Sequence, residues 1–202
     1  MIYDKFILTT ASCLKNVTNT YLLSVNKELT NYISNDYKVL YMVTHENFKL
    51  NKNGIPENDI AILKLTKSID SSKKLKIYKG TVKPTDKAVI CGWSAVKPKN
   101  INVKWSKSNF DNVDIDLSKS FYQALLPVIS KNKCKKFYGD LSNGVICAGE
   151  YGIGIDKNDH GNPLIINDHL LGIASYDSGF PIWPGIFTYV AYYENWINKI
   201  IF

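Results

Sequence analysis

The stretch VICAGEYGIGIDKNDHGNPL, Val145 to Leu164, joins two short apolar runs through a turn of glycine and polar residues. The runs Gly144–Cys147 and Leu164–Ile166 have the length and the β-branched content that are typical of strands. Asn, Asp and Gly dominate the segment between them, and these are the residues that turns favour. The stretch therefore predicts a strand–turn–strand unit, with His160 in the middle of the turn.

Similar short runs occur along most of the chain, and they are bounded by Asn, Asp, Gly, Lys and Pro. Runs of this length and spacing favour an all-β barrel or sandwich. The other predicted strands are Phe6–Ala11, Thr20–Val25, Tyr37–Thr44, Ile60–Leu65, Ala88–Trp93, Tyr122–Val128, Leu170–Ser175 and Gly185–Val190.

Helical periodicity is convincing only at the end of the chain. In YYENWINKIIF the apolar residues recur at the i, i+3, i+4 spacing of an amphipathic helix. A short helix over Ser130–Phe137 is also predicted, with Ser130 as its N-cap. The polar stretch Lys97–Asp116 predicts a long loop between two halves of the protein.

The composition excludes some classes of function. Of the 202 residues, 45% are hydrophobic and 21% are charged, which is ordinary for a globular protein. The net charge is +7, and every basic residue is lysine. Because arginine is the residue of bidentate guanine and phosphate recognition, its absence argues against a nucleic-acid-binding protein. The lysines are compatible with a solvated surface or with acidic glycans and other anionic partners. No apolar run reaches transmembrane length, so no membrane role is expected.

The four cysteines are compatible with disulfides but do not establish any pairing. The N-terminal MIYDKFILTTASCL could pass for a short secretion signal, but its alternating Ile-Leu-Thr-Thr favours a strand. Asn16 begins an Asn-Val-Thr glycosylation sequon, which matters only if the chain is secreted.

Five segments in the same order as in the family resemble chymotrypsin-type serine proteases. FILTTASC (Phe6–Cys13) resembles the strand and turn that end in Ala-His-Cys, and ENDIAILKL (Glu57–Leu65) resembles the segment with the triad aspartate. VICGWS (Val89–Ser94) resembles the entry to the second barrel. Val145–Leu164 resembles the Cys-Ala-Gly stretch that leads to Gly-Asp-Ser-Gly-Gly-Pro-Leu, and GIASYDSGFPIWPGIFTYV (Gly172–Val190) resembles the substrate-binding strand and the Pro-Gly segment behind it.

The resemblance implies one trypsin-like domain over residues 1–202, a double six-stranded β-barrel with a C-terminal α-helix. Residues 1–95 would form a partial first barrel and the crossover, residues 96–190 the second barrel, and residues 191–202 the helix. The family has strands before FILTTASC, including a terminus whose amine pairs with the aspartate that Asp159 matches. Without them we expect an incomplete first barrel or a fragment of a longer chain.

The family's chemistry needs a serine nucleophile, a histidine base and a buried aspartate. Asp59 matches the aspartate, but Ser12 stands in place of the histidine and His160 in place of the serine. Ser12 has no basic nitrogen, so it cannot act as the general base. We expect nothing to deprotonate or orient His160 as the triad does, and we expect Ser12 or a water to hydrogen-bond Asp59. The expectation is therefore an inactive homologue with no catalytic residues.

The family's substrate pocket has also changed. Gly154 falls where trypsin-like enzymes keep a specificity aspartate, and Asn158 replaces the oxyanion-hole glycine. Asp177 replaces a glycine that leaves room for substrate, so with Ser175 and Tyr176 it is expected to form a degenerate, obstructed pocket.

The resemblance implies a disulfide between Cys134 and Cys147. It also implies that Cys13 has its partner upstream of this sequence, while Cys91 has no counterpart in the family. A Cys13–Cys91 bond stays open, but two unpaired thiols are expected.

The loss of two triad residues and the Lys/Asn/Ile-rich composition resemble the inactivated protease paralogues of the scabies mite, relatives of the mite group 3 allergens. That resemblance implies a secreted, monomeric binding or decoy protein without metal or cofactor, whose partners are host or extracellular defence proteins, including complement. The alternative is a hydrolase with residual or altered activity through His160. A truncated product without a stable fold is a third possibility.

Overall fold

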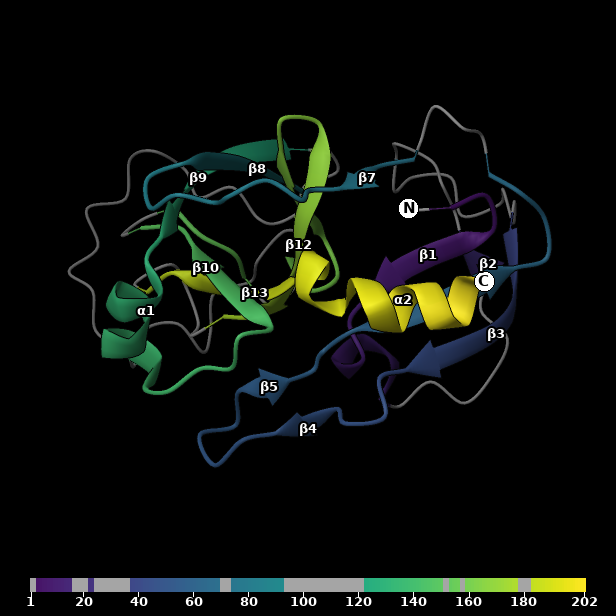
Figure 1. Cartoon of the computed structure of the whole chain (residues 1–202), viewed down its shortest axis with the longest axis horizontal. Helices are drawn as coiled ribbons and strands as arrows, with labels where there is room; N and C mark the ends of the chain where they lie inside the picture. Colours follow the sequence, from purple (N-terminus) through teal and green to yellow (C-terminus); the bar gives the residue numbers. More distant parts are fainter. Residues whose placement is uncertain are drawn as a thin grey trace, which may run out of the picture.

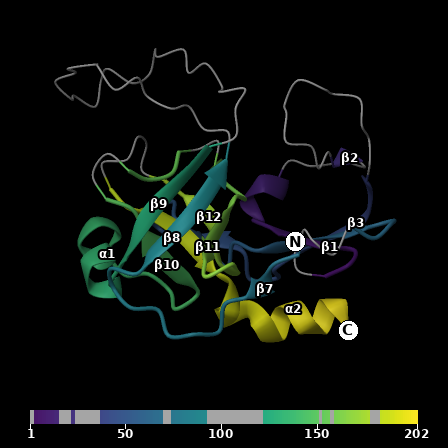
Figure 2. The same ribbon diagram turned by 90° about the horizontal axis from the view of Figure 1, so that it is seen from above.

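The computed structural model describes residues 3–15, 22–23, 37–69, 74–92, 122–150, 153–156, 159–177 and 183–202. The predicted loop Lys97–Asp116, the sequon residue Asn16 and the pocket residue Asn158 lie outside these ranges. The described chain forms two lobes side by side (Figure 1). Both termini lie at the first lobe, and Figure 2 shows the same arrangement from above.

The second lobe is a closed barrel. Its sheet has the order β11-β8-β9-β10-β13-β12-β7, and β11 also pairs with β12, so that six strands form a ring. This closure confirms the trypsin-like barrel expected for the second half. The strands are β7 (Lys76–Ile77), β8 (Lys87–Gly92), β9 (Tyr122–Ile129), β10 (Val145–Ala148), β11 (Pro163–Ile166), β12 (His169–Tyr176) and β13 (Gly185–Tyr189).

The second barrel begins earlier than residue 96, where its start was expected. β8 pairs over six residues with β9 and also with β11, so it is an integral strand of this barrel. The division between the lobes therefore falls between β6 and β7, because strand pairing and not the long loop decides it.

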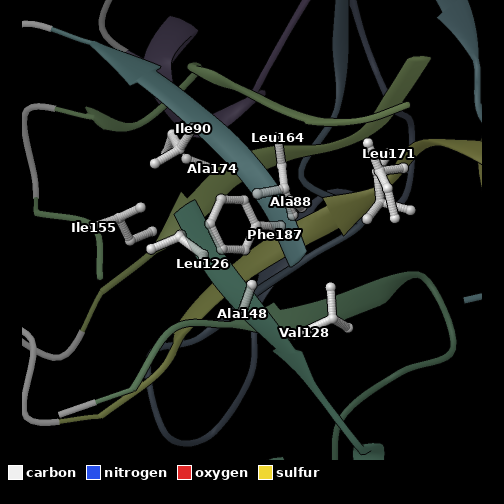
Figure 3. Packing of buried hydrophobic residues seen from close by; sticks show 11 residues of the cluster. Ala88, Ile90, Leu126, Val128, Ala148, Ile155, Leu164, Leu171, Ala174 and Phe187 are labelled. Atoms are coloured by element: carbon white, nitrogen blue, oxygen red, sulfur yellow. The ribbon is translucent and has the colours of Figure 1, made fainter. Parts of the chain in front are cut away.

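The barrel interior packs around Phe187 of β13. Its ring is fully buried, and Figure 3 shows it among Leu126, Leu164, Ala88 and Ala174. The two alanines leave the space that the ring fills, which is how small barrels reach native packing density. Burial of a phenylalanine side chain contributes about 1.5–3 kcal/mol, so this contact is a main support of the lobe.

The first lobe is a four-stranded sheet in the order β1-β6-β3-β2. Within the described residues this sheet is open, with β1 and β2 at its edges. A small β4–β5 hairpin lies below it (Figure 1). The strands are β1 (Phe6–Thr9), β2 (Leu22–Leu23), β3 (Tyr37–Thr44), β4 (Lys49–Leu50), β5 (Pro56–Glu57) and β6 (Ala61–Leu65).

Two α-helices complete the described fold. α1 (Lys131–Tyr138) begins as predicted, because the Ser130 side chain accepts a 3.2 Å hydrogen bond from the Lys133 N–H. α2 (Glu194–Ile201) follows a 3-10 turn over Val190–Tyr193 and lies across the first lobe (Figure 1). Its buried Ile197 packs in one cluster with residues of both lobes, so the helix joins them.

Candidate active site

The residues that match the triad and the substrate pocket come from both lobes. The segments that carry them are a 3-10 turn over Ser12–Leu14 after β1, Asp59 before β6, His160 in the turn before β11, and Ser175–Asp177 at the end of β12. Asn58 precedes the aspartate with a φ of 52°, a left-handed conformation that asparagine tolerates. Its side chain binds the backbone of Asn47 and the hydroxyl of Tyr193, which fixes the approach to Asp59.

Asp59 is buried, with 2% of its surface exposed, and its carboxylate is fully engaged. Oδ1 accepts a 2.7 Å hydrogen bond from the Ser12 N–H, and Oδ2 accepts one of 2.8 Å from the Ser12 hydroxyl. Oδ2 also accepts a 2.6 Å bond from the hydroxyl of Ser175. Three donors compensate the burial of this charge, which would otherwise be costly.

This geometry confirms the expected bond between Ser12 and Asp59. His160 is not among the hydrogen-bond partners of Asp59 in the described part of the chain. The two hydroxyls donate to the carboxylate but have no basic nitrogen to accept a proton from a nucleophile. The role of Ser175 was missed, because it was assigned only to the pocket and lies 116 residues from Asp59 in sequence.

His160 has a partner that the sequence analysis did not foresee. Its Nε2 lies 2.9 Å from Oδ2 of Asp177, and the two side chains are 25% and 11% exposed. The expectation that nothing would orient His160 is therefore wrong. The pair forms because the turn binds β12: the Gly161 N–H donates to the Ala174 carbonyl at 2.8 Å.

The turn around His160 is packed against the first lobe. Gly161 has a φ of +89°, and a Cβ there would lie 3.2 Å from Oγ1 of Thr9 and 3.7 Å from Sγ of Cys13. The neighbouring Asp159 is buried and accepts a 3.2 Å bond from the Asn162 amide. The turn thus keeps a defined shape, and it places His160 next to Asp177.

Aromatic residues gather beside Asp177. The ring of Tyr176 meets the edge of Tyr138, with 6.0 Å between the ring centroids, and the Tyr138 hydroxyl donates to the Pro184 carbonyl at 2.6 Å. Trp183 contacts the rings of Phe137 and Tyr138 while 41% of its surface stays exposed. Gly154 lies half-buried next to Ile153, and as a glycine it has no charged side chain to attract a basic group.

The cysteines divide as expected. Cys134 of α1 and Cys147 of β10 form a disulfide with a Cα–Cα distance of 6.3 Å. Cys13 and Cys91 are free thiols. Cys13 is exposed and accepts a 2.9 Å bond from the Thr10 hydroxyl, whereas partial burial raises the pKa of the Cys91 thiol.

Two further features bear on function. The described residues contain no cluster of three or more His, Cys, Asp or Glu side chains placed to hold a metal ion. None of the helices in the described ranges has the length and apolar character to cross a membrane.

Residues 1–197 match the model of the trypsin family. The chain is 31% identical to transmembrane protease serine 11G of Rattus norvegicus, a match that covers 98% of this chain and 48% of that protein, so the chain spans about half of its length. It is 27% identical to kallikrein-8 of Rattus norvegicus, covering 98% of this chain and 74% of that one. It is also 27% identical to trypsin of Sus scrofa, covering 100% and 83%.

The fold is similar to a solved structure of neuropsin, a serine protease expressed in the limbic system of mouse brain. The TM-score is 0.80, and the match covers 100% of this chain and 87% of that one. At 23% sequence identity this likeness concerns the fold alone.

Proposed function

The chain belongs to the trypsin family, and we propose that it is a member without peptidase activity that acts outside the cell as a binding or decoy protein. The observation that carries this proposal is the state of Asp59. Its carboxylate is buried and is occupied by the hydroxyls of Ser12 and Ser175 and by the Ser12 N–H. A trypsin-type mechanism uses that carboxylate to orient an imidazole.

The cleft supports the same conclusion. His160 stands at the nucleophile position and is held by Asp177, at the end of β12. In the resemblance this part of β12 lies along the substrate, so the Asp177 side chain and its contact with His160 obstruct the docking of an extended peptide. An extended peptide would have to displace Asp177 from His160 before it could bind.

We assign the partner to host defence proteins, complement among them, on the resemblance to inactivated mite paralogues. The retained disulfide fits an extracellular protein, because disulfides persist in oxidising compartments. The fold supplies a rigid scaffold on which binding surfaces are carried by loops and helices.

The alternative is a hydrolase with altered chemistry, and one observation favours it. The His160–Asp177 pair has the imidazole–carboxylate arrangement of a general base. His160 itself occupies the position of the family's serine, so the motif supplies no hydroxyl nucleophile for this pair, and for this reason we rank it second.

A serum lysis assay tests the proposed function. The purified protein is added to serum, and complement-dependent lysis of sensitised cells is measured for the wild type and for His160→Ala. A binding protein should inhibit lysis equally in both forms, because His160 performs no chemistry. Inhibition that disappears in His160→Ala would support the hydrolase, and the absence of any inhibition would contradict the assignment of complement.

A further inference from the structure

Helix α1 carries an unusual concentration of positive charge. Four of its eight residues are exposed lysines, and no acidic residue stands in its first turn. We call these lysines, together with one from the β4–β5 hairpin, the lysine patch. Its members are Lys52, Lys131, Lys133, Lys135 and Lys136.

The hairpin and the helix bring three of these charges, those of Lys52, Lys131 and Lys135, close to one another. Asn53, the neighbour of Lys52, has its amide nitrogen 3.9 Å from the position that a Cβ on Gly139 would take, at the end of α1. The adjacent Asp140 is 95% exposed and binds Lys135 at 2.8 Å. Lys135 is the main cause of the lowered pKa of Asp140, and Lys52 and Lys131 add to it. One carboxylate thus sits among three ammonium groups.

The charge pattern does not help the helix to form. Lys131 and Lys135 are four residues apart on one face, a spacing at which like charges repel. Lysines in the first turn also oppose the helix dipole. α1 is held instead by the Cys134–Cys147 disulfide and by the bond from the buried Tyr138 to the Pro184 carbonyl.

Three lysines elsewhere in the described chain have a carboxylate partner. Lys49 binds Glu57 at 3.4 Å, Lys79 binds Glu194 at 2.5 Å, and Lys74 binds Asp4. In the patch, within the described part of the chain, only Lys135 has a carboxylate at ion-pair distance. Five lysines against one aspartate leave an excess of four positive charges around α1.

We propose that the lysine patch binds a linear sulfated polysaccharide. Lysine is a compact point charge on a flexible stem, whereas planar bidentate recognition of carboxylates is the role of arginine, which this chain lacks. Sulfate groups along a flexible chain match such point charges without requiring fixed geometry. The patch covers the exposed sides of a short helix and has no described cleft, which suits an extended polymer that lies over a convex surface. This site lies outside the triad region. Whether the patch binds the polysaccharide therefore does not depend on whether the proposed function is correct.

Binding of fluorescent heparin oligosaccharides, followed by anisotropy at two salt concentrations, tests the proposal. The patch variant is Lys133→Glu/Lys136→Glu. The matched control is Lys38→Glu/Lys87→Glu, which changes the net charge equally at two exposed sites on strands β3 and β8. The patch variant should bind about tenfold more weakly or worse, and the control should stay within about twofold of the wild type. Wild-type binding should also weaken as salt increases.

Equal losses in the two variants would overturn the proposal, since they would mean that diffuse net charge attracts the polymer. Equal or tighter binding of desulfated heparin or of a poly-glutamate peptide would also overturn it, because sulfate would then not be the recognised group. Lys133→Gln/Lys136→Gln, with thermal melts of every variant, separates loss of the site from loss of the fold. The melt of the glutamine variant should show no destabilisation, because it removes the like charges at positions 133 and 136 of α1.

Discussion

The Ser12 hydroxyl donates a 2.8 Å hydrogen bond to the buried carboxylate of Asp59. The Ser12 backbone N–H binds the other oxygen of the same carboxylate at 2.7 Å, so the contact has two points. It joins the turn after β1 to the segment before β6, and it satisfies a carboxylate that in an active relative would orient an imidazole. The contact therefore ties two segments of the first lobe together.

Ser12→Ala and Ser175→Ala should each lower the free energy of unfolding by about 1.5–3 kcal/mol, because each removes a hydrogen bond to a buried charge. The double variant should show coupling, since both hydroxyls bind the same oxygen. Urea denaturation measures the three values. Ser142→Ala is the matched control, because the Ser142 hydroxyl is buried without a hydrogen-bond partner in the described structure, and its loss should cost under about 0.5 kcal/mol. Equal effects at all three serines would refute the role of Asp59 as their common acceptor.

Replacing both Cys134 and Cys147 by serine should cost about 3 kcal/mol of stability, since the bond closes a loop with a sequence separation of 13. Calorimetry with and without reductant checks this. Reductant should lower the Tm of the wild type and leave that of the double variant unchanged. A wild type that is insensitive to reductant would show that the bond contributes nothing.

The two free thiols should react with iodoacetamide at different rates. Cys13 is exposed, whereas Cys91 is partly buried and the pKa of its thiol is raised. At pH 8 labelling should occur first at Cys13, and labelling of Cys91 should accelerate more as the pH is raised, because its thiolate forms later. Mass spectrometry assigns the sites, with Cys13→Ser and Cys91→Ser as references. Faster modification of Cys91 would contradict the described packing.

Tyr193 should make the protein sensitive to alkali. Burial of the ring is the main cause that raises its pKa well above the ordinary value, and the charges of Tyr192 and Asp59 add to it. The folded state therefore retains a proton that the unfolded state loses above about pH 10. The contribution of Tyr193 is fully present below that pH and is lost above it, by up to about 1.4 kcal/mol per pH unit.

The test is the pH dependence of unfolding between pH 9 and pH 11, approximate limits set by the ordinary tyrosine pKa. Tyr193→Phe should flatten the decline, while Tyr41→Phe, at a partly exposed site in the first lobe, serves as the control. Identical slopes for the wild type and Tyr193→Phe would contradict this assignment.

Much of the fold could be predicted from the sequence. The predicted strand Tyr37–Thr44 has the observed bounds of β3, and the N-cap at Ser130 was correct. Both signals are local: an apolar β-rich run and a hydroxyl before a helix. The strands β4, β5 and β7 were missed, because each has only two residues and exists through pairing alone.

The candidate site was only partly predictable, because some of its contacts also depend on how distant strands pair. The match to the family's triad positions predicts that Ser12 lies beside Asp59, and the two residues are hydrogen-bonded in the structure. The bond of Ser175 to Asp59 and the pair of His160 with Asp177 depend on where β12 ends within the barrel. Residues separated by 116 and 17 positions meet through sheet topology, which a reading of local pattern does not provide.

The most direct test of the central claim is a peptidase assay with a panel of fluorogenic peptides that samples all classes of residue before the cleaved bond. The wild type and His160→Ala are measured side by side, with pig trypsin as the positive control. Our account predicts that both forms turn over no substrate above the buffer rate. Turnover by the wild type that His160→Ala abolishes would contradict it, and would identify the protein as a hydrolase that uses His160.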